Sequence, residues 1–348
     1  MELRTAILRD DIYLQHITGD YHPESHHRLE VVYRMLEDED MQDTFRVLSP
    51  RPATREELLL NHSPNYIDQV AATSGLSFCS LDPDTTTSPK SWEAARMAAG
   101  GVLVAVDRVM EGEIENAFAL VRPPGHHAES NKGMGFCLFN NIAIAAHYAR
   151  QKHLLERILI IDWDLHHGNG TQNSFYEDPQ VLYFSTHQYP YYPGSGSVDE
   201  DGQGKGKGFT VNVPLPGGQG DQDFAAIFKE ILRPIASQFK PQLILVSAGY
   251  DIYSQDPLGA MDVTPEGFAI LTSLVMDMAQ SSCQGRVVIT LEGGYHLDGL
   301  RDSVKATLKE LRGDSILKGS KKEGKESSGT EKIIEKVKGL HKASWSAL

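Results

Sequence analysis

The segment IIDWDLHHGNG, residues 160–170, places two aspartates and two histidines within six positions, directly after an apolar run. Asp164 and His166 are two residues apart, so at the end of an extended strand their side chains point the same way and can share one ion. A catalytic zinc site needs a third protein ligand and an open position for water. The pair alone is a weak indication, because an isolated Asp–His pair in a loop is more often a hydrogen-bonded turn.

Polar side chains also end or follow three other apolar runs. They are His126 and His127 after residues 117–124, Asp251 at the end of 242–251, and Tyr295 at the end of 286–295. Asp251 is the best candidate for the third metal ligand. The adjacent imidazoles of His126 and His127 follow a rigid Pro-Pro-Gly turn, and acid–base chemistry next to a metal-activated water suits them better than metal binding.

These clusters need elements that bring them together, and the sequence alternates short β-branched runs with longer helical patterns. The predicted strands are residues 117–124, 157–164, 181–187, 209–216, 242–251 and 286–295, and the predicted helices are residues 91–110, 140–154, 223–239 and 264–280. Apolar strands alternating with helices indicate a three-layer α/β/α fold with a central, mostly parallel sheet. Ligands bind beyond the carboxyl ends of such strands, so we expect the four clusters to form one site.

Composition and charge narrow the class of protein. The chain has 348 residues, 40% of them hydrophobic, and a formal net charge of −14. The length fits one large α/β domain or two ordinary ones, and the negative charge argues against direct binding to nucleic acid. No apolar run approaches the roughly 20 residues that span a bilayer, and the N-terminus is unlike a signal peptide. We expect a soluble cytoplasmic protein without a membrane partner, and buried free thiols at Cys79, Cys137 and Cys283.

Six longer motifs follow one another in an order that is similar to that of a known family. They are RPPGHHAE with GFCLFNN (122–141), IIDWDLHHGNGTQ (160–172), STHQYPYYPGSG (185–196), VNVPLP (211–216), SAGYDIYSQDPLG (247–259) and LEGGYH (291–296). From about residue 5 to residue 312 the chain closely resembles the zinc-dependent histone deacetylase superfamily, which has an arginase-like α/β fold. The HHGNG form resembles the class II and bacterial amidohydrolase branch, since class I members carry Asp in place of Asn169.

The resemblance implies a role for each residue of the site. The metal ligands would be Asp164, His166 and Asp251. The catalytic groups would be His126 and His127, as the acid–base pair, and Tyr295, as the donor to the oxyanion. Asp162 and Asn169 would be the hydrogen-bond partners of the two histidines. Zn²⁺ is the implied metal, although Fe²⁺ or Co²⁺ can replace it because mixed nitrogen and oxygen ligands select weakly. A carboxylate beside His126 favours imidazolium, whereas neutral Asn169 gives His127 no such bias. We therefore expect His127 to be the neutral general base.

Further positions match a substrate tunnel and a structural cation site. The tunnel residues are Gly135 and Phe136, Tyr192 opposite them, Leu258 as gatekeeper, and Asp84 as the rim acid, although the spacing does not decide between Asp84 and Asp82. The implied potassium site uses the Asp162 side chain, Ser185, and the backbone carbonyls of Asp164, His166 and Thr186. The rim could include His22, Glu24, His26, His27 and Arg28, with a solvated loop the favoured interpretation for His26 and His27. Arg28 resembles an arginine near the acetate exit of relatives.

Residues 313–348 differ in composition from the rest of the chain. They carry eight lysines against five acids, and residues 319–329, GSKKEGKESSG, are typical of a solvated linker. Apolar residues near helical spacing in 333–345 predict a short helix that docks on the domain. We therefore divide the chain into a catalytic domain, residues 1–312, and a basic linker with a C-terminal helix, residues 313–348.

The resemblance implies a zinc-dependent amidohydrolase that removes acetyl or other acyl groups from N-acetyl-lysine, or from a small acylated amine, and releases acetate. Leu258 argues against the main alternative, an acetylpolyamine amidohydrolase, where a carboxylate would pair with the substrate ammonium. A catalytically inactive acetyl-lysine-binding scaffold would be expected to lack a ligand or Tyr295, and this chain has them all. Binuclear manganese chemistry of the arginase type would need further Asp or His ligands. The physiological substrate, the acyl-chain preference and homo-oligomer formation stay open.

Overall fold

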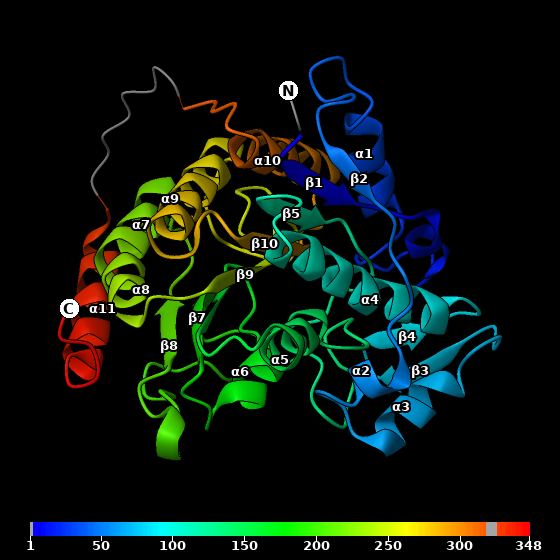
Figure 1. Cartoon of the computed structure of the whole chain (residues 1–348), viewed down its shortest axis with the longest axis horizontal. Helices are drawn as coiled ribbons and strands as arrows, with labels where there is room; N and C mark the ends of the chain where they lie inside the picture. The colour runs from blue at the N-terminus through cyan, green and yellow to red at the C-terminus, as the bar shows by residue number, and fades with distance from the viewer. Residues whose placement is uncertain (1–2, 318–325) are drawn as a thin grey trace.

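The computed structural model describes residues 3–317 and 326–348, and its core is an eight-stranded sheet in which every strand pair is parallel. The strands are β1 (Thr5–Leu8), β2 (Arg46–Leu48), β5 (Asn116–Ala119), β6 (Ile158–Asp162), β7 (Val181–Gln188), β8 (Thr210–Leu215), β9 (Leu243–Ala248) and β10 (Val287–Leu291). Their order in the sheet is β2-β1-β5-β10-β9-β6-β7-β8 (Figure 1). A separate antiparallel pair is formed by β3 (Cys79–Asp82) and β4 (Thr85–Thr87).

Helices cover both faces of the sheet (Figure 1). One layer contains α4 (Ser91–Met110), α5 (Asn141–His153) and α6 (Asn169–Phe175), and the other contains α1 (His27–Met35), α7 (Asp221–Ile227), α8 (Arg233–Phe239), α9 (Pro265–Cys283) and α10 (Leu297–Leu311). Further helices outside these two layers are η1 (Asp11–Gln15), α2 (Arg55–Leu58), α3 (Pro64–Ala71) and η2 (Gly204–Gly206). This arrangement confirms the predicted three-layer α/β/α fold with a parallel sheet.

Two parts of the predicted element pattern differ from the structure. The helix predicted over residues 223–239 is not continuous, because α7 and α8 are separated by a π-helical turn, η3 (Phe228–Leu232). Pro234 has no N–H to donate to a preceding carbonyl, which accounts for the local change in hydrogen bonding. Strands β1 and β2, which lie at one end of the sheet, were missed by the sequence analysis because they are only four and three residues long.

The four strands that precede the polar clusters are adjacent in the sheet. β5, β10, β9 and β6 are consecutive neighbours, and β6 pairs with β9 through Asp162 and Ser247. All four strands are buried along their whole length, since helices cover both of their faces. Because the strands are parallel, the loops that follow them meet at one edge of the sheet, which is where ligands bind in open α/β sheets.

The C-terminal helix α11 (Ser328–His341) lies against β8 at the edge of the sheet (Figure 1). Trp345, which follows it, packs its ring between Phe209 and Phe239 and donates its indole N–H to Gly208 O at 2.8 Å. The domain boundary at residue 312 stays a prediction. Four lysines of the predicted linker lie outside the described residues, namely Lys318, Lys321, Lys322 and Lys325.

Two further expectations concern the membrane and the cysteines. Among residues 3–317 and 326–348, no helix has both the length and the apolar character that a membrane crossing requires. All three cysteines are free, as predicted, and Cys137 and Cys283 are buried. Cys79 differs from the expectation because it is only partly buried, at the start of β3.

Candidate active site

Asp164, His166 and Asp251 meet at the carboxyl edge of the sheet, in the loops that follow β6 and β9. Nδ1 of His166 lies 3.2 Å from Oδ1 of Asp164 and 3.1 Å from Oδ2 of Asp251. The three side chains are buried, and each offers a ligand atom within 4.8 Å of the others. Two carboxylates and one imidazole form the donor set of a mononuclear catalytic metal site.

The surroundings of this triad fit a divalent cation. A Cβ atom at Gly249 would lie 2.1 Å from Oδ2 of Asp164, and one at Gly293 would lie 2.4 Å from Oδ2 of Asp251, so glycine is required at both positions. Burial, and next the negative charge of Asp164, raise the pKa of Asp251 to about 7. Two buried carboxylates that repel each other gain from a shared positive ion, which is what a metal supplies.

His126 is held by a buried carboxylate, as the sequence predicted. Its Nδ1 lies 3.1 Å from Oδ2 of Asp162, and the same oxygen accepts a hydrogen bond from the Tyr183 hydroxyl at 3.1 Å. Burial lowers the pKa of His126, but the charges of Asp164 and Asp162 outweigh it and raise the pKa to about 10. Gly168 is needed here, because a Cβ atom there would lie 2.3 Å from Oδ2 of Asp162.

His127 has a different environment from its neighbour. Its Nδ1 lies 2.8 Å from Oδ1 of Asn169, and the two histidine rings are 4.0 Å apart. Burial, followed by the positive charges of His126 and His166, lowers the pKa of His127 well below its usual value. A neutral imidazole that donates from Nδ1 to Asn169 carries its lone pair on Nε2. This arrangement agrees with the hypothesis of a neutral His127 and a charged His126.

Tyr295 follows β10 and is fixed from both sides. Its backbone N–H donates to Oδ2 of Asp256 at 2.6 Å, and the guanidinium of Arg28 lies 5.0 Å from the centre of its ring. Arg28 is itself held by the carbonyls of Gly294 and Glu292. Burial, and next the charge of Asp251, raise the pKa of Tyr295 well above its usual value. The phenol is therefore a hydrogen-bond donor at neutral pH.

The predicted tunnel residues lie beside the histidines. Gly135 has φ +55°, and a Cβ atom there would lie 2.3 Å from Cδ2 of His127. The ring of Phe136 lies 5.9 Å from that of Tyr295, and the ring of Tyr192 lies 5.1 Å from that of His127. Tyr192 thus lies beside the acid–base pair and Phe136 beside Tyr295, on different loops, as a channel wall requires.

The two candidate rim acids have different partners. Asp84 accepts a hydrogen bond from the backbone N–H of Gly135 at 3.1 Å and is therefore attached to the tunnel wall. Asp82 forms an ion pair with Lys132 at 2.9 Å. Leu258, the predicted gatekeeper, is partly buried, and its carbonyl accepts a hydrogen bond from the Tyr191 hydroxyl at 2.9 Å. These contacts favour Asp84 as the rim acid, which stays a prediction.

The residues of the implied potassium site lie on neighbouring strands. Asp162 on β6 is paired in register with Ser185 on β7, and Thr186 follows directly. Oγ of Ser185 lies 2.9 Å from Nδ1 of His187, and Oδ1 of Asp162 accepts a hydrogen bond from the backbone N–H of Asp164 at 3.2 Å. The structure brings these residues together, and the cation itself stays a prediction.

The rim expectation was wrong for Glu24 and Arg28, which are completely buried. Glu24 pairs with Arg28 at 2.9 Å and with Arg122, so its charge is compensated inside the protein and it does not face the entrance. His22 does reach the tunnel, since its ring lies 4.7 Å from that of Phe136. His26 and His27 lie partly exposed at the start of α1, where both face Glu30.

Sequence reasoning missed several residues that hold the site together. Glu292 is fully buried and accepts hydrogen bonds from the backbone N–H groups of Gly125 and His126 at 2.6 and 3.2 Å. An acid at the end of the apolar strand β10 was the signal for it. Glu129 lies only two residues beyond His127, and its carboxylate accepts a hydrogen bond from the Asn169 amide at 2.6 Å. The signal there was its place in the RPPGHHAE motif.

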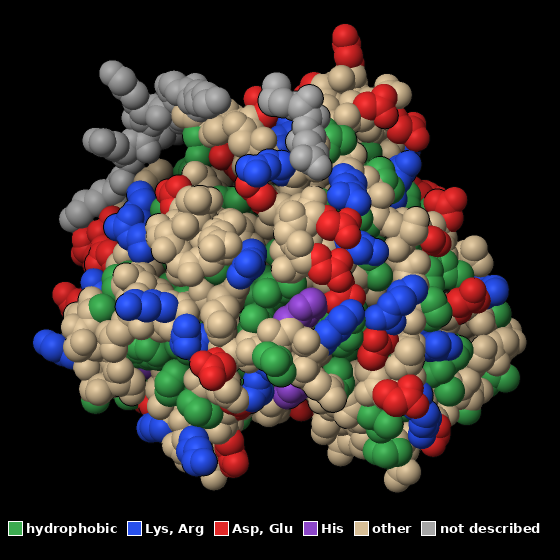
Figure 2. Space-filling view, in the orientation of Figure 1, with side chains coloured by type: hydrophobic (Ala, Val, Ile, Leu, Met, Phe, Trp, Pro, Cys, Tyr) green, Lys and Arg blue, Asp and Glu red, His purple; other side chains and the backbone are tan. Residues whose placement is uncertain are grey.

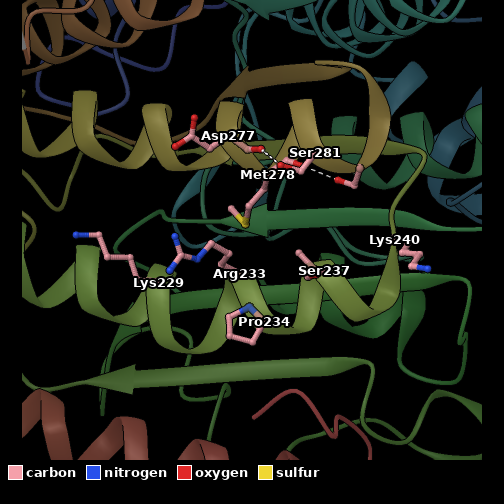
Figure 3. A pocket seen from close by; sticks show the side chains of 10 residues that line it. Lys229, Arg233, Pro234, Ser237, Lys240, Asp277, Met278 and Ser281 are labelled. Carbon is pink, nitrogen blue, oxygen red and sulfur yellow. Dashed lines mark hydrogen bonds between the residues drawn. The ribbon is translucent and has the colours of Figure 1, made fainter.

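One cavity away from the predicted site has a volume of about 680 Å³ and lies between α8 and α9. Lys229, Arg233 and Lys240 line one side of it and Asp277 the other (Figure 3). It shares no residue with the predicted site. On the face of the molecule in Figure 2, basic and acidic side chains are interspersed, so the net charge of −14 is not gathered into one patch there.

Comparisons with known proteins agree with this geometry. The family described as "Histone deacetylase domain" matches residues 22–311. A probable deacetylase of Archaeoglobus fulgidus is 41% identical over 300 residues, covering 85% of this chain and 82% of that protein. The polyamine deacetylase HDAC10 of Homo sapiens is 45% identical over 299 residues, covering 82% of this chain but 44% of that protein. The crystal structure of the HDA15 HD domain has a TM-score of 0.93 at 37% identity, covering 99% of this chain and 95% of that one.

Proposed function

The chain belongs to the histone deacetylase family and is a deacetylase, and we propose that it removes acetyl groups from N-acetyl-lysine side chains with a metal ion held by Asp164, His166 and Asp251. The observation that carries this proposal is the convergence of two buried carboxylates on Nδ1 of His166, at 3.2 and 3.1 Å. These three residues would hold a divalent ion, which we propose to be Zn²⁺ with Fe²⁺ or Co²⁺ as alternatives, and such an ion would polarise the acetyl carbonyl and lower the pKa of water.

We assign the proton transfers to His127. A neutral imidazole whose Nδ1 donates to Asn169 presents a basic Nε2, which can accept the proton of the attacking water. The same nitrogen then protonates the leaving amine, so that acetate and a free amine are released. His126, with a pKa raised to about 10 by Asp164 and Asp162 against the effect of burial, stays an imidazolium and stabilises negative charge nearby.

Tyr295 is the proposed donor to the developing oxyanion. Its hydroxyl keeps its proton at neutral pH, and Arg28 and Phe136 fix the position of its ring. One well-placed donor of this kind commonly contributes about 3 kcal/mol to the stabilisation of the transition state. Because Arg28 is buried and held by two carbonyls, it provides a rigid surface for the ring of Tyr295. The position of that ring is therefore set before the reaction begins.

The substrate side chain is proposed to pass between Phe136 and Tyr192. Aromatic rings on both sides suit an apolar methylene stem, and Asp84 at the rim would accept a hydrogen bond from the substrate backbone. Asp162 and Ser185, with backbone carbonyls of Asp164, His166 and Thr186, are proposed to bind a structural potassium ion. We also propose that the protein is cytoplasmic.

An acetylated polyamine is the second candidate substrate, because relatives from human, mouse and zebrafish are named polyamine deacetylases. Those proteins are roughly twice as long as the matched part, since this chain covers 44 to 48% of their length. Leu258 argues against this substrate, because it offers no charge to a substrate ammonium group. We therefore propose acetyl-lysine as the better substrate.

The experiment that tests the function is a substrate panel with the zinc-loaded protein. Release of the carboxylate product, which is acetate from the acetylated substrates and the corresponding longer carboxylate from the others, is measured from an acetyl-lysine peptide, from peptides with longer acyl chains and from acetylspermidine, with and without a hydroxamate inhibitor. We expect the acetyl-lysine peptide to be hydrolysed fastest and the hydroxamate to abolish the reaction. Faster hydrolysis of acetylspermidine would overturn the substrate assignment, and acetate release that the hydroxamate leaves unchanged would overturn the metal assignment.

A further inference from the structure

We infer that Glu129 is a positioning residue of the reaction, which sets the orientation of the Asn169 amide and through it the tautomer of His127. The inference rests on the proposed role of His127 as general base. It concerns a residue that touches neither the substrate nor the metal ligands. The observation behind it is a chain of two short hydrogen bonds, from His127 Nδ1 to Asn169 Oδ1 at 2.8 Å and from Asn169 Nδ2 to Glu129 Oε1 at 2.6 Å.

An asparagine amide has two ends of similar shape and opposite hydrogen-bonding character. If Asn169 were rotated by half a turn, its Nδ2 would face Nδ1 of His127, and its Oδ1 would face the carboxylate of Glu129. An ionised carboxylate accepts hydrogen bonds and donates none, so two acceptors would then lie 2.6 Å apart. Glu129 therefore excludes the rotated amide. With the amide fixed, His127 must keep its proton on Nδ1 and its lone pair on Nε2.

Glu129 is itself firmly held, as a positioning residue must be. Asn173 donates from Nδ2 to both carboxylate oxygens, at 2.9 and 3.0 Å. The backbone carbonyl of Glu129 lies 2.9 Å from Nδ1 of the buried His62, and its N–H donates to Lys132 O at 2.8 Å. Nε2 of His62 accepts from the backbone N–H of Asn140 at 2.9 Å, so Nδ1 is the nitrogen that donates to Glu129. Both the backbone and the side chain of Glu129 are thus fixed.

The test is a double-mutant cycle between Glu129 and Asn169. In the otherwise unchanged protein, Glu129→Gln allows both amides to rotate, and we expect kcat to fall about tenfold, as is usual for the outer partner of a catalytic group, with little change in KM. In Asn169→Asp the new carboxylate is repelled by Glu129. Adding Glu129→Gln to that variant removes the repulsion and supplies a donor, so kcat should rise severalfold instead of falling.

This change of sign distinguishes positioning from a merely structural role. If the role of Glu129 were merely structural, Glu129→Gln would lower kcat by the same factor whether residue 169 is Asn or Asp, and that result would overturn the inference. An unchanged kcat for Glu129→Gln in the protein that keeps Asn169 would overturn it as well. Glu113→Gln is the matched control, because Glu113 is an exposed acid whose partners, Arg46 and Arg108, are not residues of the predicted site. Thermal melting shows whether each variant folds.

A second readout does not depend on turnover. In ¹⁵N spectra of the zinc-loaded protein, with the His127 signals identified by their loss in His127→Ala, we expect a protonated Nδ1 and an unprotonated Nε2. Glu129→Gln should introduce the other tautomer. A single unchanged tautomer in Glu129→Gln would contradict the inference. Because the spectra need no substrate, a failure of the proposed function and a failure of this inference can be told apart.

Discussion

The backbone N–H of Gly293 donates to Oδ2 of Asp164 at 2.9 Å, so the turn after β10 holds a ligand that is delivered by β6. The same glycine has no room for a side chain, since a Cβ atom would lie 2.4 Å from Asp251 and 2.6 Å from Asp164. The proposed metal site is therefore shaped by a residue that would donate no ligand atom. Precise ligand placement of this kind depends on the outer partners of the site.

Gly293→Ala is expected to weaken metal binding by about tenfold or more, because the methyl group must displace both carboxylates. Zinc affinity is measured by competition with a chromophoric chelator. Gly339→Ala is the matched control, because Gly339 lies within α11 with open space around it, and alanine there should leave zinc affinity unchanged and stabilise the helix slightly. Equal zinc affinity in the two variants would show that the glycine is not required.

The pH dependence of the reaction should report on His127. In a Glu129→Gln background, Asn169→Asp places a carboxylate beside Nδ1 of His127, which raises the pKa of that imidazole by about one unit or more. A general base must be neutral to act, so it is lost as the pH falls through the higher pKa. The acid limb of kcat/KM is therefore expected to move to higher pH.

The pH profile of this double variant is compared with that of Glu129→Gln alone. Both proteins have the same residue at position 129, so the comparison isolates the effect of Asn169→Asp. His127→Ala completes the set and should lower kcat by about a hundredfold or more, the usual contribution of a general base. An acid limb that does not move, or near-normal turnover in His127→Ala, would contradict the role of His127. His126 should contribute no limb between pH 6 and 8, because its pKa is raised to about 10.

Leu258→Glu is expected to shift selectivity from acetyl-lysine toward acetylspermidine. The new carboxylate can pair with a substrate ammonium group, and a change of about 1.4 kcal/mol in relative transition-state stabilisation would alter the ratio of kcat/KM values tenfold. Leu258→Gln is the control for polarity without charge. A ratio that changes equally in both variants, or not at all, would refute the role of residue 258 as a gatekeeper.

The docking of the C-terminal helix can be tested at Trp345. Its ring is 4% exposed and packs on Phe209 and Phe239, so Trp345→Ala should destabilise this edge of the protein by about 3 kcal/mol. Trp345→Phe keeps most of the apolar contact and loses only the bond to Gly208 O, and we expect it to cost about 1 kcal/mol. Denaturant titration measures both values, and full stability of Trp345→Ala would show that residues 326–348 do not dock in solution.

The sequence predicted the central strands, and the meeting of Asp164, His166 and Asp251 at one edge of the sheet, because both depend on strong local patterns. The run before Asp164 is apolar throughout, and a polar cluster after such a run can only lie at a strand end of a covered sheet. The roles carried by Asp164, His166 and Asp251 followed from the motifs that resemble the deacetylase superfamily. The adjacency of β5, β10, β9 and β6 then explains why four distant segments meet.

The supporting residues could not be predicted in the same way, because their contacts join segments far apart in the chain. Glu24 reads as a surface acid in a polar loop, and only the fold shows that Arg122 and Arg28 compensate its burial. The orientation of the Asn169 amide likewise depends on Glu129, forty residues earlier in the chain. Local patterns specify which residue types are present, whereas packing decides which of them meet.

The central claim is that Asp164, His166 and Asp251 hold one catalytic metal ion. It is tested most directly by titrating the metal-free protein with Zn²⁺ while the initial rate of acetate release from an acetyl-lysine peptide is measured. The account predicts a rate that rises to a plateau at one equivalent, and a much weaker response in Asp251→Asn. Full activity before zinc is added, or the same one-equivalent activation in Asp251→Asn, would contradict it.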